Sequence, residues 1–432
     1  MPDSKLTSQQ IRDKQKEFLF PCVITYYKEP LVMAKGQGTR LWDHDGKEYL
    51  DFFGGILTVS LGHCEPRVNQ RIAQQVLELQ HVSTLYPTAQ QVTLAERLAH
   101  LTPGRLKKCF FTSSGTEADE TAVLLAELHT GNQELVVLRH AYAGRSMLAM
   151  NITGHAPWRL VASKVATVKH LAAPYCYRCP FGQTYPGCGV RCAKDLEELI
   201  KTTTCGRISA FMAEPILGVG GFITPPPEYF QIAVEITRKH GGVFICDEVQ
   251  TGFGRTGDHW CGIEHYGVEP EIMTFAKGIA NGSPMGATIA TPEVADSFKG
   301  LSISTFGGNP VSDAAALGTI EVMEQEEIPK RSRRLGDKLR AGLEALQKRF
   351  DFIGEVRGKG LMQAIELVNS HQTREPAAER TNALMEASKA RGLLIGKGGL
   401  HGNVLRIAPP MLIDEAALDD GLKRLGESLA AI

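Results

Sequence analysis

Two apolar runs in this chain each end on a polar side chain that can take part in chemistry. Residues 241–247 read Gly-Gly-Val-Phe-Ile-Cys-Asp and end on Asp247, and residues 272–277 read Ile-Met-Thr-Phe-Ala-Lys and end on Lys277. Runs that are apolar throughout are typical of parallel strands covered on both faces. Because ligands bind at the carboxyl ends of such strands, we expect an open α/β sheet with both side chains at one ligand site.

The combination of an aspartate and a lysine indicates the ligand. Pyridoxal phosphate requires a lysine amine, which forms a Schiff base with it. It also requires a carboxylate that keeps its pyridine nitrogen protonated, so that the ring accepts electrons. We therefore expect Lys277 and Asp247 to be the catalytic residues of carbanion chemistry on amines.

A third run, residues 108–114, leads through Ser114, Gly115 and Thr116 into a helical pattern. The first N–H groups of a helix have no partner within it, and the positive end of the helix dipole favours an anion. This turn is therefore the predicted phosphate site, with a plain helix cap as the alternative.

Two more strands add an aromatic ring and an acid. Residues 135–140 precede Tyr142, which is placed to lie over a flat ring, and residues 208–213 precede Glu214. Each signal is weak alone. Their shared position at strand ends is what supports a single site.

The same residues carry a resemblance to a known family. Residues 244–257 read Phe-Ile-Cys-Asp-Glu-Val-Gln-Thr-Gly-Phe-Gly-Arg-Thr-Gly, and residues 276–278 read Ala-Lys-Gly. In this order they resemble the signature of class III aminotransferases, which have pyridoxal phosphate fold type I. The chain is most similar to the alanine–glyoxylate aminotransferase 2-like and omega-amine transaminase group. The resemblance covers nearly the whole length and implies a mostly parallel-sheet large domain plus an α+β small domain.

The resemblance also implies roles for individual residues. Lys277 would be the Schiff-base lysine and Asp247 the partner of the pyridinium. Val249 would back the ring opposite Tyr142, and Gln250 would lie near the phenolic oxygen. The remaining cofactor-binding residues implied are Ser114, Gly115, Thr116, Glu214 and Thr305. Thr305, before Phe-Gly-Gly-Asn, would bind the phosphate of the neighbouring subunit's cofactor, so the active site would span a homodimer.

Arg406 is the expected receptor for a substrate carboxylate, because a guanidinium binds a carboxylate with two parallel hydrogen bonds. The alternative is an arginine in a surface salt bridge. The resemblance further places Ile56, Leu57 and Tyr86 in the substrate pocket. Family members of the ornithine and γ-aminobutyrate type carry a glutamate where this chain has Val219. A glutamate-gated dual-substrate mechanism is therefore not expected.

These residues predict an aminotransferase that moves an amino group from an amino acid or amine to a keto acid or aldehyde, of pyruvate or glyoxylate type. Such a reaction has ping-pong kinetics. One alternative is a phospholyase of the same fold that acts on an amino-alcohol phosphate. It would need further cations near the pocket, for which Arg145 and Lys397 are candidates. The other alternative is a non-catalytic dimeric binding protein on the same scaffold.

The length and the net charge of the chain limit its possible domain organisation and function. At 432 residues the chain exceeds one ordinary core. The predicted division is an N-terminal segment, 1–64, that packs with the small domain, a large cofactor-binding domain, 65–320, and a C-terminal small domain, 321–432. The formal net charge of -1 argues against a nucleic-acid footprint. No apolar run approaches the ~18 residues of a membrane helix, and the cytoplasm is the expected compartment.

The pattern of charged and apolar residues changes beyond residue 321. Charged amphipathic patterns predict helices over 333–346 and 414–429. Apolar runs predict strands over 360–365 and 404–407. This mixture predicts the α+β small domain.

Residues 252–257, Gly-Phe-Gly-Arg-Thr-Gly, fit the glycine pattern of a dinucleotide site. No helix start follows them, and the acids precede the glycines, whereas the acid that binds the ribose follows about 20 residues later. A nicotinamide enzyme is therefore not favoured.

Four cysteines cluster in a loop rich in tyrosine, proline and glycine: Cys176, Cys179, Cys188 and Cys192. Their spacing could hold one structural zinc ion in a thiolate site. They could also close disulfides or stay reduced in a surface insertion. No metal is assigned to the predicted active site.

Overall fold

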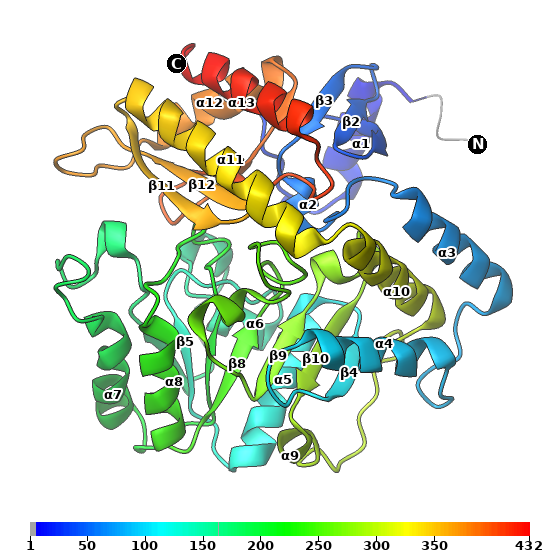
Figure 1. Cartoon of the computed structure of the whole chain (residues 1–432), viewed down its shortest axis with the longest axis vertical. Coiled ribbons are helices and arrows are strands. Elements are labelled where there is room, and N and C mark those ends of the chain that lie inside the picture. The colour runs from blue at the N-terminus through cyan, green and yellow to red at the C-terminus, as the bar shows by residue number, and fades with distance from the viewer. Residues whose placement is uncertain (1–5, 163) are drawn as a thin grey trace.

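A seven-stranded sheet forms the centre of the larger part of the molecule, in the lower half of Figure 1. The computed structural model describes residues 6–162 and 164–432. In spatial order the strands are β4 (Lys108–Thr112), β10 (Gly286–Ala290), β9 (Ile272–Phe275), β8 (Val243–Asp247), β7 (Ala210–Ala213), β5 (Leu135–Leu138) and β6 (Val168–Leu171). From β9 to β6 all neighbours run parallel, and β10 is antiparallel to both β9 and β4.

The burial of these strands explains their sequences. Every residue of β5, β7, β8 and β9 is buried. Strands covered on both faces read as continuous apolar runs, which is the pattern the sequence shows. The prediction of a mostly parallel α/β sheet is confirmed, with Asp247 as the last residue of β8 and Lys277 just beyond β9.

The larger part of the molecule also contains the helices that precede, connect and follow these strands. They are α3 (Pro66–Glu78), α4 (Ala89–Leu101), α5 (Gly115–Thr130), α6 (Met147–Ile152), α7 (Arg191–Thr203), α8 (Tyr229–Lys239), α9 (Pro292–Ala295) and α10 (Pro310–Gln325). Short 3₁₀ turns are η2 (Ala156–Trp158), η3 (Cys176–Arg178), η4 (Gly262–Tyr266) and η5 (Lys277–Ala280). Helix α5 packs against β8, β9 and β10, and its N-terminus opens at the carboxyl ends of the parallel strands β8 and β9.

The upper half of Figure 1 combines the two ends of the chain in two four-stranded sheets. One sheet has the order β1 (Met33–Gln37), β2 (Arg40–Asp43), β3 (Glu48–Asp51) and β13 (Leu393–Leu394). The other has the order β11 (Ile353–Lys359), β12 (Met362–Leu367), β15 (Val404–Ile407) and β14 (Gly396–Gly398). The parallel pairing of β3 with β13 joins N-terminal residues to C-terminal ones.

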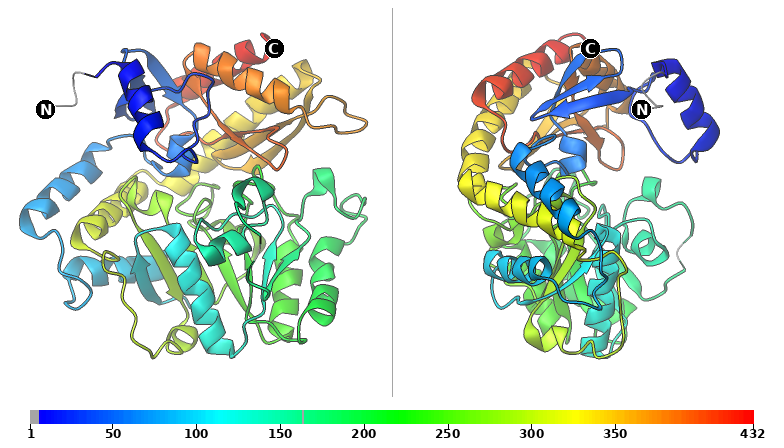
Figure 2. Two further views of the ribbon diagram at one scale, coloured as in Figure 1. Left: turned by 180° about the vertical axis from the view of Figure 1, so that it is seen from behind. Right: turned by 90° about the vertical axis from the view of Figure 1, so that its right-hand side faces the viewer.

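The helices of this upper half are α1 (Ser8–Phe18), α2 (Gly54–Leu57), α11 (Ile328–Arg349), α12 (Ala378–Ala390) and α13 (Glu415–Leu429). Figure 2 shows α1 on the outside, close to the sheet that contains β1, β2 and β3. Within the described residues, no helix is both long and apolar enough to cross a bilayer.

The structure also contains elements that the sequence patterns did not reveal. The antiparallel β10 and the edge strands β1, β6 and β11 were not predicted, and α11 extends beyond the predicted 333–346 at both ends. The glycine-rich residues 252–257 form successive turns and do not begin a helix. This conformation differs from the strand–turn–helix of a dinucleotide site, in agreement with the sequence-based interpretation.

Candidate active site

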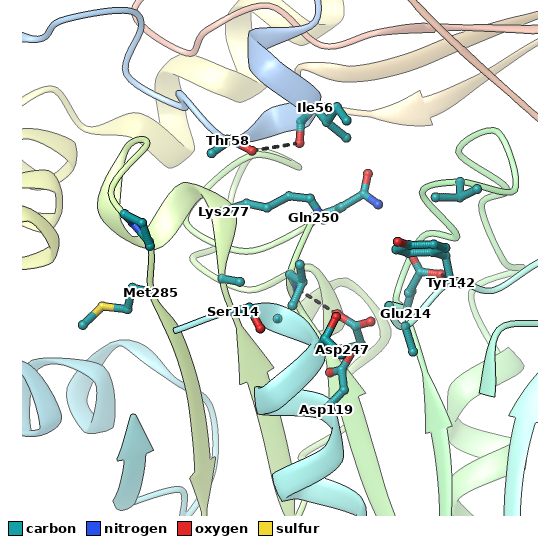
Figure 3. Close-up of a pocket in the computed structure, with 18 of the residues that line it drawn as sticks. Ile56, Thr58, Ser114, Asp119, Tyr142, Glu214, Asp247, Gln250, Lys277 and Met285 are labelled. Atoms are coloured by element: carbon teal, nitrogen blue, oxygen red, sulfur yellow. Dashed lines mark hydrogen bonds between the residues drawn. The ribbon is translucent and has the colours of Figure 1, made fainter. Parts of the chain in front are cut away.

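A cavity of about 660 Å³ lies at the carboxyl ends of the parallel strands (Figure 3). Most of the predicted site residues line it: Ile56, Ser114, Gly115, Thr116, Tyr142, Glu214, Asp247, Val249, Gln250, Lys277 and Arg406. They come from five separate stretches of the large sheet and its loops, together with α2 and β15. The topology therefore collects residues that are far apart in the sequence, as the shared strand-end position predicts.

Three predicted residues do not line this cavity in their own chain: Leu57, Tyr86 and Thr305. Leu57 is buried in an apolar cluster with Phe53. The backbone is left-handed at both Ile56 and Leu57, so the turn leaves Ile56 at the cavity and Leu57 in the core. Tyr86 and Thr305 lie on the surface of the chain.

Lys277 is held in an unusual backbone conformation at the start of η5. Its φ of 47° is left-handed, which costs a non-glycine residue on the order of 1–3 kcal/mol and persists only where the surroundings impose it. Asn281, directly after η5, is anchored to the loop before α3, because its side chain accepts from the Leu61 N–H and donates to the Gly62 carbonyl. Burial lowers the pKa of Lys277, while the charge of Asp247 opposes that shift. A lowered pKa favours the neutral amine that acts as a nucleophile or base.

Three buried carboxylic acids lie beside this lysine: Asp119, Glu214 and Asp247. Asp247 accepts the Val249 N–H at 2.9 Å, and burial raises its pKa. Glu214 accepts the N–H groups of Gly218 at 2.8 Å and Tyr142 at 3.3 Å, and burial followed by the charge of Asp247 raises its pKa. Several buried acids beside one lysine favour an additional cation. The protonated ring nitrogen of pyridoxal phosphate fits this requirement at Asp247.

The start of α5 provides the place for an anion. Ser114 is the N-cap, and its hydroxyl oxygen accepts the Glu117 N–H at 3.3 Å. The N–H groups of Gly115 and Thr116 follow in the first turn, where a helix offers them no internal acceptor. Both residues line the cavity, so this turn could hold a phosphate group.

Flat surfaces and an amide line the space between the acids and the helix turn. Tyr142 and Trp158 form an edge-to-face pair with ring centroids 5.5 Å apart, and Val249 lines the same cavity. The amide of Gln250 packs directly on Gly218, where a Cβ atom would lie 2.3 Å from it. Its Oε1 is buried without a hydrogen-bond partner among the described residues. A side-chain amide with unused capacity suits the phenolic oxygen of the cofactor.

Arg406, on β15, is a buried cation without a carboxylate partner among the described residues. Its guanidinium donates to the Lys397 carbonyl at 3.0 Å and lies over the ring of Phe53, 4.8 Å from the centroid. Val219 also lines the cavity. Its carbonyl oxygen and the Arg406 side chain both lie against Gly398, so the two residues are close neighbours. Burial lowers the pKa of Arg406. A desolvated guanidinium held at its edge by carbonyls keeps its remaining donors for an anionic ligand.

Sequence reasoning did not identify all of the lining residues. Asp119, Trp158, Tyr26 and Met285 also line the cavity. Asp119 lies within the helix that follows the phosphate turn, where one acid among several carries no distinctive signal. Its position one helical turn beyond Gly115 could have indicated it, since residues four apart share a helix face.

The four loop cysteines, Cys176, Cys179, Cys188 and Cys192, are free thiols around one small pocket. Within the described residues, no group of three or more histidine, cysteine, aspartate or glutamate side chains has an arrangement that could hold a metal ion. Burial is the main cause that raises the pKa of the Cys176 and Cys192 thiols. Protonated thiols are poor nucleophiles and metal ligands.

The sheet topology and a cavity with a lysine, an aspartate and a helix turn at the strand ends define a pyridoxal-phosphate-dependent enzyme of fold type I. The family model for class-III aminotransferases matches residues 25–429. The chain belongs to the class III aminotransferase family. It is therefore a transaminase that uses pyridoxal phosphate, as the sequence predicted.

Individual relatives agree with this assignment. The chain is 42% identical to alanine–glyoxylate aminotransferase 2 homolog 2, mitochondrial, of Arabidopsis thaliana, over 93% of this chain and 83% of that protein. A phospholyase from Arthrobacter in complex with phosphoethanolamine superposes with a TM-score of 0.90 at 33% identity, covering 98% of this chain and all of that one. A PLP-bound amine transaminase from an uncultivated Pseudomonas species gives a TM-score of 0.89 at 31% identity, covering 96% and 98%.

Proposed function

We propose that the enzyme transfers an amino group from an amino acid or amine to a small keto acid or aldehyde, of pyruvate or glyoxylate type. The buried guanidinium of Arg406 at the cavity, which has no carboxylate partner among the described residues, is the observation that carries this proposal. A keto acid supplies the carboxylate that such a group lacks. The name of the Arabidopsis relative, an alanine–glyoxylate aminotransferase, supports the same substrate class.

The proposed mechanism assigns one task to each group of residues. When bound, pyridoxal phosphate accepts electrons from the carbon next to the substrate nitrogen. The N–H groups of Gly115 and Thr116 would hold its phosphate, and Asp247 would hold the proton on its ring nitrogen. The amine of Lys277 would act as the base that removes the proton from the substrate Cα. The same group would then deliver a proton to the carbon on the other side of the nitrogen. A positioned base of this kind contributes about 10²–10⁴-fold to the rate.

The outer part of the cavity selects the substrate. Arg406 fixes the carboxylate by two hydrogen bonds, which orients the Cα–H bond toward Lys277. Apolar side chains, including Phe53, Ile56 and Met285, cover the rest of the space and restrict water. With Val219 in place of a carboxylate beside Arg406, no glutamate switch masks the guanidinium when an uncharged substrate enters.

Arg406→Ala is expected to raise the KM for pyruvate or glyoxylate and to lower kcat/KM by roughly 10–150-fold, because a hydrogen bond to a charged group is worth about 1.5–3 kcal/mol. Uncharged amine donors should be nearly unaffected. Arg406→Lys should rescue little, since an ammonium cannot form the two parallel bonds. Steady-state kinetics for both half-reactions measure this.

The matched control is Arg145→Ala, which removes an exposed arginine outside the cavity and should leave the kinetics unchanged. Equal losses for keto acids and uncharged amines in Arg406→Ala, together with a lowered melting temperature, would identify Arg406 as a structural residue. The carboxylate-substrate proposal would then lose its main support.

Phosphate elimination from an amino-alcohol phosphate is the second candidate, favoured by the structural similarity to the Arthrobacter phospholyase. Neither Arg145 nor Lys397 lines the cavity, and the Lys397 ammonium donates to Asn382. Among the described residues, the lining cations are Lys277 and Arg406. A cavity with so few cations suits a carboxylate better than a phosphate dianion. Release of inorganic phosphate from phosphoethanolamine would reverse this preference.

We also propose a homodimer in which Thr305 of one subunit contacts the cofactor phosphate of the other. Two surface segments carry exposed apolar side chains: Leu85, Tyr86, Leu301, Ile303 and Phe306. The segments adjoin, because the rings of His81 and Phe306 lie 5.5 Å apart. Apolar surface of this kind is typical of an interface. On this arrangement Tyr86 would also reach the partner's cavity.

Light scattering on the purified protein should therefore give twice the chain mass of 47.1 kDa. Phe306→Asp should shift the protein toward the monomer, because it places a charge in the apolar contact, and activity should fall with dimer content. A fully active wild-type monomer would contradict the proposal. Lys299→Glu, a charge reversal on an exposed residue outside both segments, is the control.

The domain limits 1–64, 65–320 and 321–432 are part of the same proposal. The β3–β13 pairing supports placing the N-terminal segment with the small domain. Limited proteolysis that cuts first near residue 64 or 320 would support these limits. For the compartment we retain the cytoplasm, although the name of the Arabidopsis relative assigns that protein to the mitochondrion. Subcellular fractionation would decide.

A further inference from the structure

Asp119 is a buried acid that the mechanism above does not use. It lies on α5, one turn beyond the phosphate site, with only 2% of its surface exposed, and it lines the cavity. The Thr274 hydroxyl donates to its Oδ1 at 2.8 Å. Thr274 is the residue directly opposite Asp247 in the β8–β9 pairing. Figure 3 shows the side chains of Asp119 and Asp247 next to each other below the cavity.

Charged and titratable groups from three other elements face Asp119. Asp247 at the end of β8 and Glu214 after β7 raise its pKa, in addition to burial, which is the largest cause. The Thr274 hydrogen bond and the charge of Lys277 act in the opposite direction but are weaker. Two carboxyl groups that share a buried site cannot both ionise at neutral pH.

The hydrogen bonds distinguish the members of the pair. Asp247 accepts from the backbone N–H of Val249, a fixed donor that stabilises the ionised form. The partner of Asp119 is the Thr274 hydroxyl, which can donate to an ionised carboxylate or turn to accept from a protonated acid, so this contact does not require the charged form.

We propose that Asp119 is a positioning residue that stays protonated beside Asp247, so that Asp247 alone carries the negative charge facing the ring nitrogen of the cofactor. The neutral acid occupies the buried space below the ring and excludes water from Asp247. It adds no second buried negative charge, which would repel the charge on Asp247 and favour the neutral form of that acid. This inference rests on the proposed role of Asp247 and extends it to a second residue.

Asp119→Asn is the most direct test, because an amide reproduces the shape and neutrality of a protonated acid. NMR of the enzyme loaded with ¹⁵N-labelled pyridoxal phosphate reports whether the ring nitrogen is protonated. We expect a protonated nitrogen in the wild type and in Asp119→Asn, and a neutral nitrogen in Asp247→Asn. A neutral nitrogen in Asp119→Asn would overturn the inference, because Asp119 would then supply the charge.

Asp119→Ala serves as a second variant, because it also has no ionisable group at this position. It should likewise keep the ring nitrogen protonated. The two levels of the proposal fail separately. A protonated nitrogen in Asp247→Asn would remove the role of Asp247 and with it the premise. Loss of the proton in Asp119→Asn alone would remove only the role of Asp119.

The cofactor-free protein gives an independent readout. Because the pKa of folded Asp119 is raised, the stability it contributes is complete below the pKa of an unfolded aspartate, about 3.9, and is lost as the pH rises through the folded pKa. Asp119→Asn has no such group. The melting temperature of Asp119→Asn, relative to that of the wild type, should therefore rise as the pH is increased from 4 to 8. If the melting temperature of the wild type instead rises relative to that of Asp119→Asn over this pH range, Asp119 is ionised in the folded protein and the inference is overturned.

Discussion

Lys277→Ala is expected to abolish covalent attachment of the cofactor and to reduce turnover by at least about 10²–10⁴-fold, the contribution of a positioned proton-transfer group. The variant loses both the amine that bonds the cofactor and the base that moves the Cα proton. The fold should persist, because alanine keeps the backbone and removes an amine whose charged form is already disfavoured by burial. Pyridoxal phosphate should still bind without a covalent bond through the turn at Ser114, Gly115 and Thr116.

Absorbance in the near-visible region and single-turnover kinetics measure these two effects. Lys299→Ala, which removes an exposed lysine outside the cavity, should behave like the wild type. A cofactor that borohydride still fixes to the Lys277→Ala protein would contradict the assignment, since another lysine would then form the bond.

Asp247→Asn should lower turnover by roughly 10–150-fold, while cofactor affinity changes far less. The substitution keeps the shape but removes the charge that holds the proton on the ring nitrogen. A hydrogen bond to a charged group exceeds the neutral equivalent, and 1.5–3 kcal/mol corresponds to this range in rate. The proposed phosphate contacts at the start of α5, which would contribute to affinity, are not changed by this substitution.

The measurement compares kcat with the dissociation constant of the cofactor in the same preparation. Asp337→Asn, on the exposed side of α11, is the control. Near-normal turnover in Asp247→Asn would assign the role to another strand-end acid, with Glu214 as the first candidate. An equal loss of affinity and turnover would instead point to a damaged site.

Much of this site could be predicted from the sequence because the buried parallel strands mark their own ends. A strand covered on both faces must be apolar, so the first polar residue after it stands out, as Asp247 and Lys277 do. The small residues at Ser114 and Gly115 were identifiable for a related reason, since a helix that starts at a strand end must leave its N–H groups open.

Other features depend on contacts that a single sequence does not contain. Strand β10 runs antiparallel between β9 and β4, and its short run Gly-Ala-Thr-Ile-Ala has no distinctive pattern. Leu57 was predicted at the pocket but faces the core, because four successive left-handed residues, 54–57, form a turn that the sequence pattern does not reveal. Asp119 was missed because its significance comes from Asp247, which lies on a strand distant in the sequence.

The central claim is that Lys277 bonds the cofactor of a class III aminotransferase, and peptide mapping after borohydride reduction tests it most directly. The wild-type enzyme, loaded with pyridoxal phosphate, is reduced, digested and examined by mass spectrometry. The account predicts one modified peptide that contains Lys277, and prior addition of an amine substrate should decrease its yield. A label on any other lysine, or no label on a protein that still transaminates, would contradict the account.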